Sequence, residues 1–189
     1  MCPRAEILMQ QVFDQILADH RYQSNLDWGK PREGHPEGTV RAHIAELERN
    51  LRQVRPAISQ EYYWKLKVLI HTHDTFKGEA KAGTTITNPR SHSSIAREFL
   101  SQYCQDEDLL NMVQYHDEGY ALWQQFSERG KSNQDRFANL LATIKDWNLF
   151  LWFNIIDACT EGKSREPIIW FIEEVNRYVE TFISADFIS

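Results

Sequence analysis

The chain is organised around the stretch His71-Thr72-His73-Asp74-Thr75-Phe76-Lys77. It follows an apolar run at helical spacing, and it brings imidazole, carboxylate and amine groups within a few positions of one another. His73 and Asp74 offer a neutral nitrogen and an anionic oxygen, which suit borderline divalent ions such as Mn, Fe, Co, Ni or Zn. Two ligands cannot hold a catalytic ion alone. The sequence therefore predicts that acidic residues or histidines from other segments converge on this pair.

Histidine and aspartate residues on both sides of the pair can supply the missing ligands. One lies upstream and three lie downstream, each on or beside a segment with helical periodicity. In a helical bundle, side chains from helices that face one another can converge and form a metal site. The predicted metal ligands are His43, His73, Asp74, His92, His116 and Asp157.

Apolar residues at helical spacing predict an all-α protein, an irregular helical bundle without strand alternation. The predicted helices cover residues 5–19, 39–54, 59–74, 93–103, 106–116, 119–126, 135–146, 149–158 and 167–183. Ser59 is the predicted N-cap of the helix that delivers the His-Asp pair. Two polar, glycine-rich segments, 22–38 and 75–91, are predicted to be loops over the site, the second a mobile lid. The predicted core consists of Leu47, Leu69, Ile95, Phe99, Leu110, Val113, Leu141, Leu151, Ile155 and Ile172.

Length and composition predict one compact domain over residues 1–189. The 42% apolar side chains are enough for a sizeable core. A net charge of −6 argues against an extended nucleic-acid surface or an anionic-membrane surface. The most apolar run, 149–156, is far shorter than the roughly 20 residues that span a bilayer. Three cysteines without metal-site spacing, together with an N-terminus that lacks a signal-peptide core, predict reduced thiols and a cytoplasmic protein.

The order of the ligands resembles the signature of the HD-domain superfamily. That signature is a histidine, a His-Asp pair and a distal aspartate, matched by His43, His73-Asp74 and Asp157. His92 and His116 match two histidines that an expanded variant of the family adds. The resemblance implies an HD-type helical fold, and the expanded variant usually holds two metal ions. His43, His73 and Asp157 would hold one ion and His92 and His116 the other, with the paired aspartate joining them.

Two local details support the resemblance and two depart from it. Lys77 matches a lysine that the family often carries three residues after the paired aspartate. Residues 35–43 are similar to the approach to the first histidine in HD domains of bacterial tRNA nucleotidyltransferases. The similarity covers roughly residues 34–160, which would form the metal-site core. However, Phe76 stands where the family often has a small residue. Asp117, not a second histidine, follows His116, so the cyclic-dinucleotide subclass is a poor match.

The resemblance implies a metal-dependent phosphohydrolase that cleaves a phosphate mono- or diester of a nucleotide or related small molecule. Its divalent ions (Mn, Fe, Co, Ni, Mg or Zn) would activate water for attack on phosphorus. Asp74 and Lys77 are the predicted catalytic residues, Asp74 as the bridge between two ions and Lys77 as a contact to substrate phosphate. Two alternatives stay open: a di-iron oxygenase of the same superfamily, which uses nearly the same six ligands, and a regulatory domain that binds a nucleotide without catalysis.

Other polar residues near the ligands are predicted to lie outside the site. His71 is two positions from His73, and side chains at that spacing do not share a helix face. We therefore expect His71 to have a packing or supporting role. Asp117 and Glu118 form an acidic pair at a helix end and are predicted to be solvated.

Overall fold

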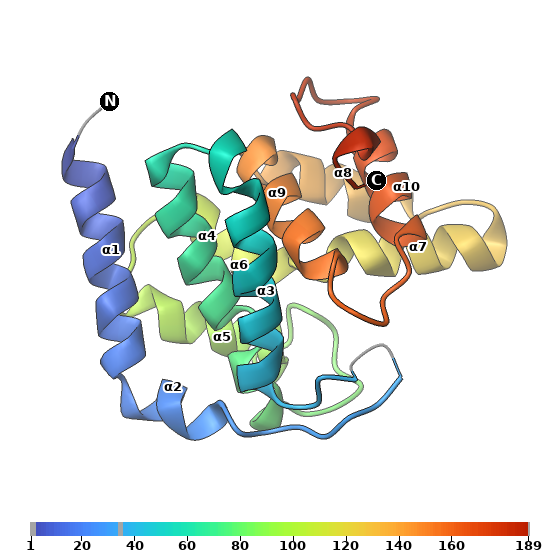
Figure 1. Cartoon of the computed structure of the whole chain (residues 1–189). Coiled ribbons are helices and arrows are strands. Elements are labelled where there is room, and N and C mark those ends of the chain that lie inside the picture. The colour runs from blue at the N-terminus through green and yellow to red at the C-terminus, as the bar shows by residue number, and fades with distance from the viewer. Residues whose placement is uncertain (1–2, 34–35, 189) are drawn as a thin grey trace.

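The computed structural model describes residues 3–33 and 36–188, and its regular structure is helical (Figure 1). Within these residues there is no β-strand, only an isolated antiparallel bridge between Gly29 and Thr39. The predicted all-α fold class is therefore confirmed. In the described part of the chain, no helix is both long and apolar enough to cross a membrane.

The helices follow one another with short connections, apart from the segments that precede α3 and α5. The α-helices are α1 (Pro3–Ala18), α2 (His20–Asn25), α3 (Val40–Val54), α4 (Gln60–Thr72), α5 (His92–Ser101), α6 (Glu107–Tyr115), α7 (Glu118–Arg129), α8 (Gln134–Thr143), α9 (Trp147–Ala158) and α10 (Glu166–Val175). The 3-10 helices are η1 (Arg55–Ala57), η2 (Thr75–Gly78) and η3 (Ala185–Ile188).

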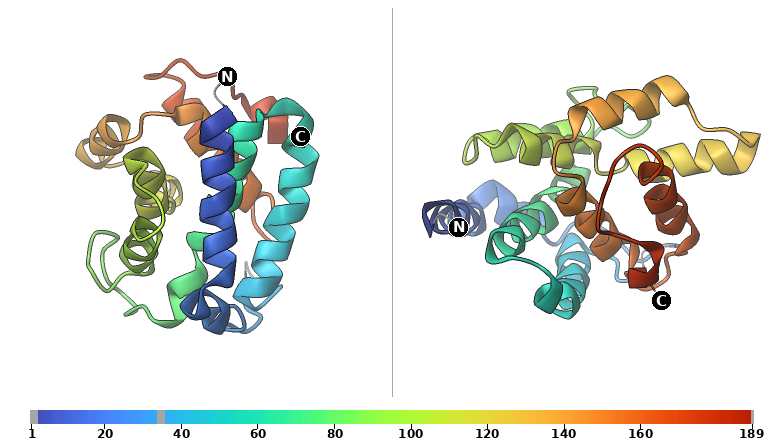
Figure 2. Two further views of the ribbon diagram at one scale, coloured as in Figure 1. Left: turned by 90° about the vertical axis from the view of Figure 1, so that its left-hand side faces the viewer. Right: turned by 90° about the horizontal axis from the view of Figure 1, so that it is seen from above.

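Helix α4 is the central element of the bundle. It packs against α1, α3, α5, α6 and α9. In Figures 1 and 2, α1 lies along one flank of the molecule while α7 and α10 lie on the opposite side. Leu66, Leu69 and Ile70 of α4 are fully buried, as are Phe150 and Leu151 of the neighbouring α9. The apolar sequence of α4 thus carries the His-Asp pair at its end into the interior.

Side-chain oxygens start the helices that hold the site. The hydroxyls of Thr39, Ser59 and Ser91 accept hydrogen bonds from backbone N–H groups in the first turns of α3, α4 and α5, at 3.2, 3.1 and 3.1 Å. Each bond satisfies an N–H that has no partner within its own helix. Ser59 was the predicted cap and is confirmed. Because Ser91 is the cap of α5, that helix begins at His92, one residue earlier than predicted.

The start of α2 and the end of α10 differ from the prediction, and at both places a side chain forms a hydrogen bond with the backbone. The predicted loop 22–38 begins inside helix α2, which starts because the Asp19 carboxylate accepts a backbone hydrogen bond at 2.9 Å. The last predicted helix extends too far, because α10 ends at Val175. The side-chain amide of Asn176 then donates to the carbonyl of Ile183 at 2.8 Å, which folds the chain back on itself.

The predicted core is buried, with one exception. Leu141 on α8 is only partly buried, because Phe137 and Leu140 supply the inward face of that helix. The residues confirmed as core are Leu47, Leu69, Ile95, Phe99, Leu110, Val113, Leu151, Ile155 and Ile172.

Removing a core side chain from α3 should destabilise the protein. Leu47 is 0% exposed, so Leu47→Ala leaves a cavity and is expected to lower the free energy of unfolding by about 2–5 kcal/mol. Leu8→Ala is the matched control, because Leu8 is 58% exposed on α1, and we expect it to change that free energy by less than about 0.5 kcal/mol. Urea denaturation of the three proteins measures both effects. Equal losses would contradict the assignment of Leu47 to the core.

Candidate metal centre

The His-Asp pair lies where α4 ends. His73 is the C-cap of α4, and Asp74 follows as the chain turns into η2. His73 is 1% exposed and Asp74 is 7% exposed. The change of backbone direction lets both side chains face the same interior space, with His73 Nε2 lying 3.5 Å from Asp74 Oδ2.

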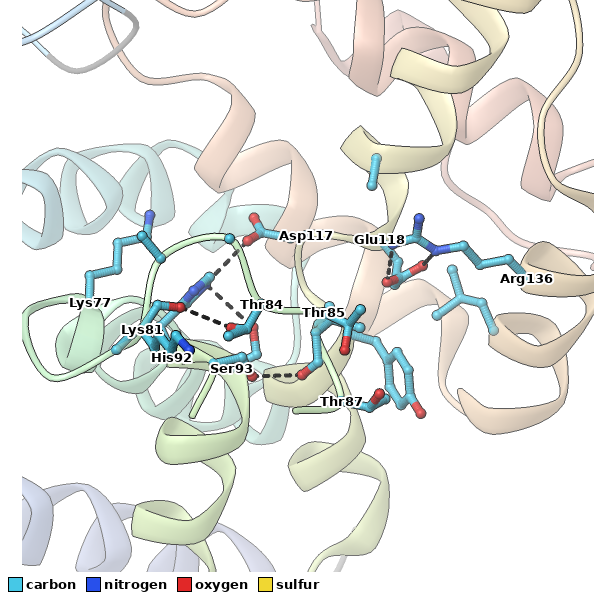
Figure 3. Close-up of a pocket in the computed structure, with 18 of the residues that line it drawn as sticks. Lys77, Lys81, Thr84, Thr85, Thr87, His92, Ser93, Asp117, Glu118 and Arg136 are labelled. Atoms are coloured by element: carbon cyan, nitrogen blue, oxygen red, sulfur yellow. Dashed lines mark hydrogen bonds and ion pairs between the residues drawn. The ribbon is translucent and has the colours of Figure 1, made fainter. Parts of the chain in front are cut away.

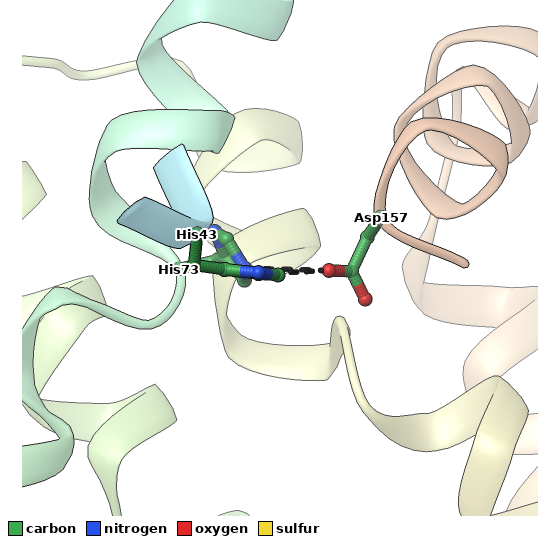
Figure 4. A group of neighbouring side chains, drawn as sticks. All are labelled: His43, His73 and Asp157. Carbon is green, nitrogen blue, oxygen red and sulfur yellow. Dashed lines mark ion pairs between the residues drawn. The ribbon is translucent and has the colours of Figure 1, made fainter. Parts of the chain in front are cut away.

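Three residues from separate helices form a first group of potential metal ligands. They are His43 of α3, His73 and Asp157 of α9, and one ligand atom of each lies within 4.8 Å of the others. His43 Nε2 lies 3.0 Å from Asp157 Oδ1, and His73 Nε2 lies 3.9 Å from the same oxygen. Both imidazoles point toward this carboxylate (Figure 4). Asp74 Oδ2 approaches the group from another side, 3.5 Å from His73 and 3.9 Å from His43.

A second group of potential ligands lies on the other side of Asp74. It consists of Asp74, His92 at the start of α5 and His116 at the end of α6, again with ligand atoms within 4.8 Å. Asp74 Oδ1 lies 3.7 Å from His92 Nε2 and 3.4 Å from His116 Nε2. The two oxygens of Asp74 thus face different groups. All six residues that the sequence predicts as ligands are brought together, in the predicted grouping.

The imidazoles are oriented by contacts to their Nδ1 atoms. Nδ1 of His73 lies 3.2 Å from two carbonyl oxygens in the last turn of α4, and Nδ1 of His116 lies 2.8 Å from a carbonyl oxygen of α6. A carbonyl only accepts hydrogen bonds, so each Nδ1 carries a proton and Nε2 faces the group. Nδ1 of His43 lies 3.1 Å from Glu37 Oε1. Three histidines therefore present Nε2 to the centre.

The donor atoms of the centre fit divalent cations. His73 Nε2 and Asp74 Oδ1 are buried and make no hydrogen bond to any described residue. Buried polar atoms without a partner are costly, so a native structure normally supplies one. Imidazole nitrogens with carboxylate oxygens are a preferred ligand set for first-row divalent ions. The two adjacent His/Asp groups can thus each hold one ion.

Burial and neighbouring charges shift the pKa values of the centre in different directions. Burial lowers the pKa of His73 to about 3, so its imidazole is neutral. Burial also opposes a charge on His116, but the carboxylates of Asp117 and Asp74 outweigh it and raise the pKa to about 9. Burial opposes ionisation of Asp74, yet Lys77 and the imidazoles hold its pKa well below the usual range. Asp74 is therefore a carboxylate throughout the neutral pH range.

A cavity of about 870 Å³ lies beside the second group (Figure 3). His92 and Asp117 are among its lining residues. The predicted lid 75–91 begins with η2, and its remaining residues 79–91 form one wall of the cavity. Its other polar lining residues include Lys77, Lys81, Thr84, Thr85, Thr87 and Arg136. The cavity therefore connects the second group to a space lined by cations and hydroxyl groups.

Two acidic residues predicted to be solvated have specific contacts. Glu118 is 2% exposed, and both of its oxygens accept hydrogen bonds from the guanidinium of Arg136. The prediction is wrong for Glu118, because Arg136 on α8 compensates its buried charge. The Asp117 side chain is 52% exposed, but Oδ2 lies 3.1 Å from His92 Nε2 and Oδ1 lies 3.5 Å from His116 Nε2. The sequence signal was its position directly after a predicted ligand.

Sequence reasoning missed two further contacts at the first group. Glu37 contacts His43, and Lys163 Nζ lies 2.9 Å from Asp157 Oδ1. Glu37 belongs to the 35–43 run that supports the family resemblance, whereas His35 of that run lies outside the described residues. Lys163 follows α9 in a turn, and no local pattern indicates that its amine returns to the centre.

His71 lies outside both groups and supports α4 from the side. The Tyr22 hydroxyl lies 2.6 Å from His71 Nδ1, and Glu48 Oε1 lies 3.0 Å from His71 Nε2. Lys67 Nζ lies 3.0 Å from the same Glu48 oxygen. This network joins α2, α3 and α4 behind the centre, in agreement with the supporting role predicted for His71.

Comparison with known protein families, with curated proteins and with solved structures finds no match to this chain. The function must therefore be inferred from the centre itself, two buried His/Asp groups in an all-helical protein.

The network of His71, Glu48 and Lys67 should make the stability of the fold sensitive to acid. Burial by itself would raise the pKa of Glu48, but hydrogen bonds from His71 and Lys67 outweigh it and hold the pKa below its ordinary value of 4.5. A lowered carboxyl pKa stabilises the fold above the unfolded-state value, and that stability is lost as the pH falls through the folded-state value. Glu48→Gln should therefore cost about 1–3 kcal/mol at pH 7, and its difference from wild type should shrink below pH 4.5. Urea denaturation across this range measures it; a constant difference would contradict the assignment.

Proposed function

We propose that the protein is a metal-dependent phosphohydrolase of the HD type, acting on a phosphate mono- or diester of a nucleotide or related small molecule. The observation that carries the proposal is the division of the Asp74 carboxylate between two histidine pairs. Its Oδ2 faces His43 and His73, and its Oδ1 faces His92 and His116. A carboxylate that serves two ions is a common feature of two-metal hydrolytic sites, where paired ions stabilise the attacking and leaving oxygens.

The residues of each group have defined roles in this proposal. His43, His73 and Asp157 would hold one ion, His92 and His116 the other, and Asp74 would bridge them. A divalent ion supplies Lewis acidity in such a site, acidifying a bound water and neutralising charge on phosphoryl oxygens. The contacts to the Nδ1 atoms hold the imidazoles in the required orientation before any ligand arrives.

Lys77 would bind the substrate phosphate. Its Nζ forms an ion pair with Asp74 Oδ2, and its side chain lines the cavity. Burial opposes a charge on this amine, but Asp74 and Asp117 outweigh burial and raise the pKa of Lys77. The ammonium therefore stays charged at neutral pH, between the bridging carboxylate and the space where an ester would lie.

The lining of the cavity supports an anionic small molecule as substrate. Lys77 and Lys81 supply positive charge, although the whole chain has a net charge of −6, while the charge of Arg136 is offset by Glu118. Threonine hydroxyls of the 79–91 segment can donate hydrogen bonds to phosphate or sugar oxygens. A volume of about 870 Å³ is in the range of small-molecule sites.

The reaction catalysed separates the proposal from its alternatives. A di-iron oxygenase would use nearly the same ligands but would consume oxygen. A non-catalytic regulatory domain would not require two histidine pairs aimed at one carboxylate. Phosphate release with Mn²⁺, Co²⁺ or Mg²⁺ supports hydrolysis, whereas oxygen consumption with iron supports the oxygenase.

A metal-reconstituted screen over nucleotides and phosphate esters tests the proposal. The wild type should release phosphate or a phosphomonoester, and Asp74→Asn should lose turnover and bound metal, because it removes the shared anionic ligand. Asp135→Asn is the matched control: Asp135 is exposed on α8, and its loss should change neither. Circular dichroism verifies that the variants fold. An Asp74→Asn protein with full activity and full metal content would refute the assignment.

Lys77→Ala should separate substrate binding from metal binding. The variant loses a phosphate contact but no proposed ligand, so we expect kcat/KM to fall about 100-fold while metal content stays near wild type. Lys145→Ala is the control, because Lys145 is exposed in the α8–α9 connection and is not among the residues that line the cavity. Kinetics and elemental analysis are measured on the same samples. Unchanged kinetics in Lys77→Ala would remove this residue from the site.

A further inference from the structure

The second group of ligands has a carboxylate that the six-residue set does not include. Asp117 Oδ2 lies 3.1 Å from His92 Nε2, and its Oδ1 lies 3.5 Å from His116 Nε2. Asp74 Oδ1 lies 3.7 and 3.4 Å from the same two nitrogens. The two imidazoles are thus each in reach of two carboxylates. We infer that Asp117 is a seventh protein ligand, which holds the second divalent ion together with His92, His116 and Asp74.

This inference rests on the metal centre of the proposed function, and it makes the two halves of that centre equivalent. The first half has two histidines, the carboxylate of Asp157 and one oxygen of Asp74. Without Asp117, the second half has two histidines and only the other oxygen of Asp74. With Asp117, each half has two imidazole nitrogens, a carboxylate of its own and a share of the bridge.

Charge gives an independent reason for a second carboxylate. Neutral imidazoles do not offset the charge of a divalent ion, and the single negative charge of Asp74 is shared with the first half. Part of that charge is already offset by the ion pair with Lys77. Asp117 has no salt-bridge contact with a Lys or Arg among the described residues, and its carboxylate oxygens lie nearest the imidazole nitrogens that would bind the ion. Asp157, in contrast, pairs with Lys163.

The backbone explains why consecutive residues reach the same place. His116 is the C-cap of α6, and Asp117 is the N-cap of α7. The chain changes direction between these helices, so the imidazole and the carboxylate converge on His92 from α5. Asp117 is also 52% exposed and lines the cavity, where Figure 3 shows it facing His92. Its carboxylate lies between the second group and the substrate space.

The carboxylate oxygens favour some divalent ions over others at the second site. Carboxylates suit Mn²⁺ and Mg²⁺, whereas sites dominated by imidazole and thiolate suit Zn²⁺. With two histidines and two carboxylates, the second site should take Mn²⁺ readily. This gives a binding assay that does not depend on knowing the substrate.

A supporting role for Asp117 predicts the opposite result. If its carboxylate only accepted hydrogen bonds from the imidazoles, it would hold their protons and compete with the ion. Removing it would then leave Mn²⁺ affinity unchanged or increase it. If Asp117 is a ligand, removing its carboxylate weakens the binding of the second ion and leaves the affinity for the first ion unchanged.

The experiment is a Mn²⁺ titration of the chelator-treated full-length protein, with free Mn²⁺ measured by electron paramagnetic resonance. The wild type should bind two ions. Asp117→Asn should bind the first ion with wild-type affinity and the second at least about 10-fold more weakly, because the second site loses a direct carboxylate ligand. Asp117→Ser, which removes the carboxylate with a smaller side chain, should behave in the same way. Asp135→Asn removes an exposed charge from α8 and should match the wild type.

Two results would overturn the inference. One is an Asp117→Asn protein that binds two ions with wild-type affinity or more tightly. The other is a wild type that binds fewer than two ions. The binding result can be told apart from the outcome for the proposed function. If the wild type binds two Mn²⁺ ions and Asp117→Asn selectively weakens the second, but the wild type hydrolyses no phosphate ester, the ligand is supported and the reaction is rejected.

Discussion

The burial of the Asp74 carboxylate is the constraint on which the centre depends. A carboxylate out of water is costly unless cations and hydrogen-bond donors surround it. Here the compensation comes from Lys77, which pairs with one oxygen, and from imidazoles that approach both. This arrangement leaves His73 Nε2 and Asp74 Oδ1 without a hydrogen bond to any residue that the structure describes. The protein core thus contains a polar cluster whose hydrogen bonds among these residues are incomplete, and a bound cation would complete its contacts.

The fold and the centre depend on each other because the proposed ligands come from five helices that are separate in the sequence. Helix α4 packs against five other helices, and its end delivers the His-Asp pair to the place where α3, α5, α6 and α9 meet. Caps at Thr39, Ser59 and Ser91 fix where three of these helices begin, and hence the direction in which their side chains point. The convergence of the ligands is therefore a consequence of ordinary helix packing.

The sequence predicted what local patterns encode. Helical periodicity identified every α-helix of the described residues except α2, and nine of the ten residues predicted as core are buried. Residue type identified the six potential ligands, because histidines and aspartates beside apolar faces tend to point inward or toward a partner. Contacts between distant segments left no such pattern. The salt bridges of Lys163 with Asp157 and of Arg136 with Glu118 depend on how helices pack. The early end of α10 likewise depends on a bond from Asn176 to a carbonyl beyond the helix.

Lysines and metal ions would use the same carboxylates, which links ion binding to substrate binding. Lys77 pairs with Asp74, and Lys163 pairs with Asp157. In the proposed enzyme, both carboxylates become ligands, so each ammonium shares its partner with a divalent ion of greater charge. The lysines then have less negative charge to neutralise, and Lys77 already lines the cavity. In the proposed enzyme, loading the centre would therefore add positive charge to this cluster, and the loaded form would attract an anionic ester more strongly than the metal-free form.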